Sequence, residues 1–235
     1  MKKKIILYFS FSFLFCQNIP FEIGEKLLFN ASFSGLNAAS ASLEVIEKLK
    51  INNKNVYHIK FTAKSKGAIN YLFPINDEVD LWLDEKTLLP VRIHENINEG
   101  NYRRLRKINF NHKNGYAIIN NDSINIDHTT QSPYSLFYFF RMQNIMKFIH
   151  QDITLIQNGK IIKLKLDINK DEKIIVPAGT YTCLTISPKR KDDKQFKNKA
   201  EMDIFFSNDE NQYPVKIRLS LKIGSLILKL REIIN

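Results

Sequence analysis

The chain has 235 residues, a formal net charge of +11 and 44% hydrophobic residues. That length suits one large all-β domain, or two small ones, and a core of this size folds without disulfide staples. The basic residues are scattered along the chain rather than gathered in one block. The positive charge is therefore explained better by a Lys-, Asn- and Ile-rich composition than by a dedicated surface for an anionic partner.

The first sixteen residues have the pattern of a secretory signal peptide. Lys2, Lys3 and Lys4 form a basic start, and residues 5–15 are apolar except for two serines. This run is too short for a membrane-spanning helix, which needs about 20 apolar residues. We therefore expect export to the periplasm or the outer membrane, cleavage near Cys16, and no transmembrane span in the mature chain.

Cys16 also raises the alternative of a lipoprotein. Phe15 and Phe13 stand where lipoprotein signals usually carry a small residue and a leucine, so lipidation at Cys16 is not expected. Removal of residues 1–16 from the 235 leaves 219 residues and takes away three lysines, which lowers the net charge from +11 to +8. The sequence thus predicts one exported β-rich domain over residues 17–235. This domain can form no internal disulfide, because Cys183 is its sole cysteine. Export also argues against a nucleic-acid partner.

Apolar and polar residues alternate with a period of two through most of the mature chain, as half-buried strands require. Asn-Gly pairs at 114–115 and 158–159 are typical of tight hairpins between such strands. Many short strands separated by turn residues predict an all-β fold, mainly antiparallel, in which a curved meander sheet forms a barrel or half-barrel. The clearest alternating stretches are residues 57–63, 79–83, 108–110, 162–168, 202–206 and 215–221.

One segment breaks this alternation. Ser132 followed by Pro133 has the form of a helix N-cap and first helical residue, and we expect a short helix over residues 133–146. A second helical turn is predicted over residues 67–72, ended by Pro74.

The residues form no catalytic or metal-binding pattern that names a reaction. The five histidines lie singly on different predicted elements, and paired His or Cys motifs, hydrolase signatures and Gly-rich phosphate loops are absent from the sequence. Cys183 stands in an alternating stretch, which favours a small core residue over a nucleophile. Trp82 shares one strand face with Glu78, Asp80 and Asp84, either as a binding platform or as an amphipathic cover. We predict a non-enzymatic protein without a cofactor.

Four strings resemble the exported bacterial family called domain of unknown function 3108. They are residues 21–27 (FEIGEKL), 135–141 (SLFYFFR), 176–181 (VPAGTY) and 207–215 (SNDENQYPV), the last followed by 223–225 (IGS). The resemblance covers essentially the whole mature chain. It implies an exported β-rich domain and no assigned activity.

Two functions of different classes remain open. The first is a carrier whose curved sheet, closed by the predicted helix, holds a lipid or other hydrophobic ligand. The aromatic residues that would line its cavity have an alternative role, which is to fill the core. The second is a structural or assembly role in the envelope, with a partner protein docked on a sheet edge or on the basic face of Lys216, Arg218 and Lys222. A hydrolytic enzyme is a third, remote, alternative. The candidate ligand-binding residues are Tyr71, Phe73, Phe137, Tyr138 and Arg141, the arginine facing an anionic head group.

Overall fold

A computed structural model describes residues 19–149, 151–192, 201–221 and 224–235. The predicted signal peptide with Cys16, and also Lys222, lie outside the described residues. The strands are β1 Lys26–Phe33, β2 Leu36–Ile51, β3 Lys54–Ser65, β4 Asn76–Asp84, β5 Pro90–Glu99, β6 Tyr102–Asn111, β7 Tyr116–Ile119, β8 Asp122–Asn125, β9 Ile153–Gln157, β10 Lys160–Val176, β11 Gly179–Arg190, β12 Glu201–Ser207, β13 Pro214–Leu221 and β14 Gly224–Ile234. The helices are α1 Gly67–Leu72, α2 Ser135–Met142 and the 3-10 helix η1 Ile145–Phe148.

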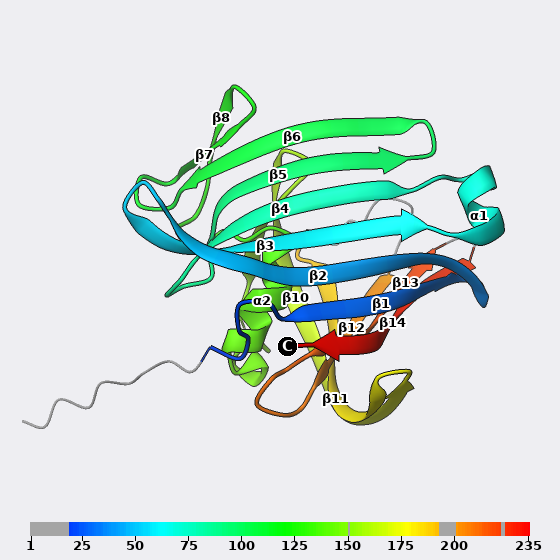
Figure 1. Cartoon of the computed structure of the whole chain (residues 1–235). Coiled ribbons are helices and arrows are strands. Elements are labelled where there is room, and N and C mark those ends of the chain that lie inside the picture. The colour runs from blue at the N-terminus through cyan, green and yellow to red at the C-terminus, as the bar shows by residue number, and fades with distance from the viewer. Residues whose placement is uncertain (1–18, 150, 193–200, 222–223) are drawn as a thin grey trace, which may run out of the picture.

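The strands form one antiparallel sheet in the order β8-β7-β6-β5-β4-β3-β2-β1-β14-β13-β12-β11-β10-β9. Strands that follow one another in the chain pair, except for β8 and β9, which form the two edges of the sheet. In addition β1 pairs with β14, which joins the two halves of the meander. The sheet is strongly curved, and it continues from β14, which lies beside β1, to strands that lie behind and below the layer made by β1 to β6 (Figure 1). The predicted all-β, antiparallel, barrel-like meander is therefore confirmed.

Turns alternate between the two ends of such a sheet. The β1–β2 turn, α1 and the β5–β6 turn lie together at one end, which we call the α1 end (Figure 1). The start of β1 and the β2–β3 turn lie at the opposite end beside α2, which we call the α2 end.

The period-two pattern of the sequence is visible in the burial of β4. Val79, Leu81 and Leu83 are buried on the inner face, while the side chains between them are partly exposed on the outer face. On the outer face, Trp82 is stacked against His58, with ring centroids 4.8 Å apart, and the Arg92 guanidinium lies 5.8 Å from the indole. Because His58 from β3 and Arg92 from β5 already contact the indole, Trp82 has the features of an amphipathic cover.

The segment between β8 and β9 covers the edge of the sheet and carries both α2 and η1. Gln131 pairs with β9, where its N–H donates to Thr154 O and its carbonyl accepts from Ile156 N–H. Ser132 Oγ accepts the Ser135 N–H at 3.0 Å, as the predicted cap requires, and regular helix begins at Ser135. The predicted 133–146 helix is thus present as two shorter helices. Of the described helices, none is long and apolar enough to cross a membrane.

Helix α2 lies between two clusters of buried apolar side chains. Tyr138 belongs to the first cluster, which comes mainly from β1 to β7. Leu136 and Phe140 belong to the second, which comes mainly from β9 to β13. The interior beside α2 is therefore packed with side chains, and burial of this apolar area supplies much of the folding free energy.

Candidate functional site

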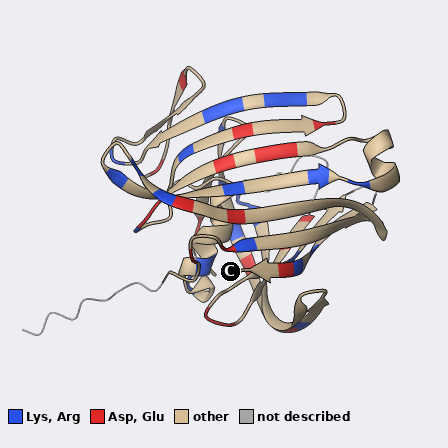
Figure 2. Ribbon diagram, in the orientation of Figure 1, with Lys and Arg blue, Asp and Glu red and all other residues tan. Residues whose placement is uncertain are grey.

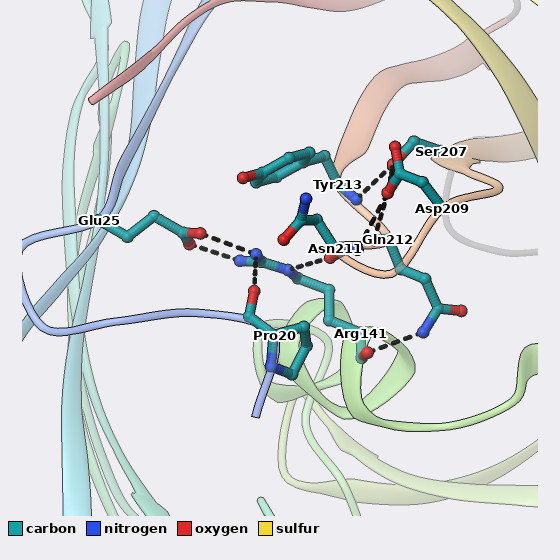
Figure 3. A network of polar contacts seen from close by, with 8 residues as sticks. All are labelled: Pro20, Glu25, Arg141, Ser207, Asp209, Asn211, Gln212 and Tyr213. Carbon is teal, nitrogen blue, oxygen red and sulfur yellow. Dashed lines mark hydrogen bonds and ion pairs between the residues drawn. The ribbon is translucent and has the colours of Figure 1, made fainter. Parts of the chain in front are cut away.

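Arg141, at the last turn of α2, is 1% exposed and lies in a closed polar network (Figure 3). Its guanidinium donates to both carboxylate oxygens of Glu25, at 2.5 and 2.8 Å. It also donates to the Pro20 carbonyl at 2.6 Å and to the Asn211 carbonyl at 3.0 Å. The forked geometry matches the bidentate pairing that arginine forms with carboxylates.

Aromatic rings enclose the same guanidinium. The rings of Phe21, Tyr138 and Tyr213 have centroids 5.5, 5.6 and 5.0 Å from the guanidinium carbon. These contacts join the segment before β1, α2 and the β12–β13 turn, which are far apart in the sequence. Three of the four strings that carry the family resemblance therefore meet at Arg141.

This environment gives Arg141 a structural role. Glu25 neutralises its charge, and the donor groups are directed at protein acceptors rather than at an open space. Arg141 is thus not placed to meet the head group of a ligand as the sequence suggested, because Glu25, 116 positions earlier in the chain, already occupies that place.

A cavity of about 970 Å³ opens at the α1 end of the sheet. Its rim is formed by Tyr71 and Phe73, from α1 and the residue after it, and by Tyr102 at the start of β6. Ile97 of β5 and Tyr134, which precedes α2, form its apolar floor. This volume is within the range of pockets that hold small organic ligands, which is about 300–1,000 Å³.

One wall of the cavity is charged. Arg104 Nε lies 3.1 Å from Glu95 Oε2, and Arg106 Nε lies 3.6 Å from the same oxygen. Arg104 also donates to Asn158 Oδ1 at 3.0 Å, which connects β6 to the β9–β10 turn across the open side of the sheet. Two guanidinium groups therefore share the Glu95 carboxylate on this wall, while Asp77 and Glu99 bring two further carboxylates to the lining of the same cavity.

Asp77 brings a second titratable group to the same cavity. Its carboxylate accepts the Asn98 N–H at 2.7 Å. Burial, with a further contribution from nearby Glu99, raises the pKa of Asp77 to about 6. Burial also raises the pKa of the Tyr134 hydroxyl, so that tyrosine stays neutral. The negative charge opposing the arginines therefore becomes weaker in mild acid.

The structure brings together two of the five predicted ligand-binding residues. Tyr71 and Phe73 both line the cavity. Phe137 packs against both core clusters and Tyr138 is fully buried beside Phe21, so these two lie with Arg141 in the packed part of the interior. Their role in ligand binding stays a prediction.

Sequence reasoning missed the charged wall. Arg104 and Arg106 belong to the basic stretch at residues 103–107, and their even numbers place them on the same strand face as Ile108 and Phe110, which are buried. The alternation of β6 therefore contained the signal that these two arginines point inward.

The described residues give no metal centre. Within them, no group of three or more His, Cys, Asp or Glu side chains is gathered in a way that could hold a metal ion. Cys183 is buried in the first core cluster, and burial raises the pKa of its thiol to about 12. What the cavity can do chemically is to bind, with an aromatic rim and with arginine and carboxylate side chains in its wall.

Two solved structures are similar to this chain at low sequence identity. A β-barrel-like protein of domain of unknown function DUF1849 from Brucella abortus is 10% identical, with a TM-score of 0.57, and the match covers 90% of this chain and 97% of that one. A Bacteroides fragilis protein with a YmcC-like fold is 10% identical, with a TM-score of 0.42 and coverage of 92% and 98%. The first of these likenesses shows a shared fold.

Sequence comparison identifies the family. No curated protein sequence matches the chain. The family model described as "Protein of unknown function (DUF3108)" matches residues 28–231, a range that spans β1 to β14. This confirms the resemblance found in the four strings, and the chain belongs to the DUF3108 family of proteins of unknown function.

Proposed function

We propose that the protein is a non-enzymatic, exported binding protein that holds an amphipathic, anionic ligand such as a fatty acid or lipid in the cavity at the α1 end. The observation that carries this proposal is the combination, in one cavity of about 970 Å³, of an aromatic rim with the guanidinium groups of Arg104 and Arg106 on one wall, where both contact Glu95.

The two sides of the cavity suit the two parts of such a ligand. Tyr71, Phe73 and Ile97 offer apolar surface to a hydrocarbon portion. Arg104 and Arg106 offer two guanidinium groups in a partly desolvated wall, where a carboxylate or phosphate gains more from a charge-assisted hydrogen bond than it does in water.

The alternative, a partner protein docked on the basic face of β13, has less support. The Arg218 guanidinium is taken up by Asp203, with Nη2 at 2.6 Å from the carboxylate, and the Lys216 ammonium lies 4.6 Å from the centre of the Phe205 ring. Both cations therefore already have intramolecular partners, and we advance the carrier over the scaffold.

The proposal is tested with protein purified from the envelope of cells that express the full chain. Native mass spectrometry is expected to detect a bound lipid or fatty acid, and the mass of the polypeptide gives the mature N-terminus. A dansyl-labelled fatty acid then measures binding directly, with one saturable site expected.

Matched variants on β6 locate the site. Arg106→Gln removes an inward cation and is expected to weaken binding of the dansyl fatty acid about tenfold, a loss of ~1.4 kcal/mol. Lys107→Gln removes the neighbouring outward cation and is expected to change nothing. Equal effects of the two substitutions, or a ligand-free protein that shows no saturable binding of the probe, would overturn the proposal.

A further inference from the structure

The α1 end presents a concentrated group of exposed apolar side chains. Tyr71 is 90% exposed, Leu72 81%, Phe73 49% and Tyr102 48%, and helix α1 buries none of its residues. Large apolar side chains are exposed singly on most protein surfaces, but a contiguous group of them marks an interaction site.

These four side chains, which we call the α1 tip, belong to one surface. All four line the mouth of the same cavity. The Gly100 N–H donates to the Pro74 carbonyl at 2.7 Å, which fixes the end of α1 to the β5–β6 turn. A methyl group added at Gly100 would come within 2.6 Å of the Phe73 ring, so the two segments are in close contact.

Hydrogen bonds at both ends of the α1 segment hold the tip in place. The Lys66 N–H donates to the Ala38 carbonyl at 2.8 Å, and Ser65 Oγ donates to Asn70 Oδ1 at 2.6 Å while accepting the Ile75 N–H at 2.8 Å. Both ends of the α1 segment are therefore tied to the sheet. The apolar side chains project from a braced element.

Three cations lie near this apolar tip (Figure 2), and one carboxylate, that of Glu99, lines the same cavity mouth. Lys64 and Lys66 immediately precede α1, and Arg103 follows Tyr102. All three are exposed, and within the described residues none of them forms an ion pair with a carboxylate. By contrast Lys60, four residues before Lys64 on β3, pairs with Glu78 at 3.1 Å. The charge around the tip is thus left available to an external anion.

We infer that the α1 tip docks on the surface of an anionic phospholipid bilayer. Tyr71, Leu72 and Phe73 enter the head-group region, where aromatic and leucine side chains are favoured, and the three cations meet lipid phosphates. A bilayer suits the tip better than a protein partner does, since a stable protein interface buries about 1,200–2,000 Å² and a few projecting side chains offer much less.

This inference goes beyond ligand binding and does not depend on it. Because Tyr71, Phe73 and Tyr102 also line the cavity, a docked tip would turn the mouth of the cavity toward the bilayer. The two properties are separable by substitution, since Lys64 and Lys66 do not line the cavity.

The test is flotation of the mature full-length protein with vesicles. Binding is expected to vesicles that contain phosphatidylglycerol and phosphatidylethanolamine, and not to neutral phosphatidylcholine vesicles. Lys64→Gln/Lys66→Gln should lower the partition coefficient at least tenfold, since each cation near an anionic surface contributes about fivefold. Leu72→Ser should also lower it, and high salt should weaken binding of the unaltered protein.

Controls come from exposed positions away from the α1 end. Lys50→Gln/Lys54→Gln removes two exposed cations at the β2–β3 turn, and Ile175→Ser removes an apolar side chain that is 72% exposed. Both variants should float like the unaltered protein. Lys64→Gln/Lys66→Gln should retain dansyl fatty acid binding, so failure of docking is distinguished from failure of the carrier proposal. Three results would overturn the inference. The tip and control variants could float equally, or the protein could bind neither kind of vesicle. A photocrosslinker at position 72 could also capture a protein and no lipid in cells.

Discussion

Substitution of Arg141 by methionine should destabilise the protein strongly. The change removes four hydrogen bonds, two to Glu25 and one each to the carbonyls of Pro20 and Asn211. It leaves the Glu25 carboxylate, which is 2% exposed, without a counter-charge. Breaking a buried ion pair in this way costs about 3–5 kcal/mol. For a chain of this size that corresponds to a fall in melting temperature of about 6–20 °C.

The assay is urea and thermal unfolding followed by circular dichroism, with an exposed arginine as the matched control. Arg218 also donates twice to one carboxylate, at 2.9 and 2.6 Å from Asp203 Oδ2, but its side chain is 45% exposed. Arg218→Met should therefore cost less than ~1 kcal/mol. Equal losses in the two variants, or a loss below ~1 kcal/mol for Arg141→Met, would refute the argument from burial.

Two further predictions follow from buried titratable groups. The folded-state pKa of Asp77 is about 6 against an ordinary value of 3.8, so the folded chain holds a proton that the unfolded chain releases, and stability falls as pH rises through this window. Asp77→Asn should raise the free energy of unfolding by about 1–2 kcal/mol at pH ~7.5, and it should remove most of this pH dependence in urea titrations. A loss of stability of this variant at pH ~7.5 would contradict the reasoning. Cys183 is fully buried and the pKa of its thiol is raised to about 12, so a disulfide reagent should modify it only as fast as the protein unfolds, and rapid labelling of the native protein would contradict this assignment.

Much of the fold could be predicted from the sequence because burial follows strand alternation closely. In β4, the inward positions Val79, Leu81 and Leu83 and the outward position of Trp82 all follow from a period of two. The pairing of β1 with β14 could not be predicted in the same way. It joins Lys26 to Ile234, and local alternation contains no information about a partner that far away in the chain.

The candidate site was predicted in part for the same reason. Tyr71 lies in the predicted helical turn over residues 67–72 and Phe73 lies between that turn and Pro74, and local signals of this kind place side chains at a sheet end. The environment of Arg141 depends on Glu25 and on the Asn211 carbonyl, contacts that exist only once three distant segments have come together. A local pattern reveals that an arginine follows aromatic residues, and it does not reveal which carboxylate neutralises it.

The four strings that carry the family resemblance lie at contacts within the fold. Residues 21–27, 135–141 and 207–215 supply the ion pair, the rings and the carbonyls around Arg141, and residues 176–181 form the β10–β11 turn, whose Ala178 N–H donates to the Leu230 carbonyl. These are contacts that hold the sheet and α2 together. The cavity residues Tyr71, Arg104 and Arg106 lie outside all four strings, at the opposite end of the sheet. The strings therefore identify the residues that hold the fold together, and the proposed ligand site at the α1 end does not include them.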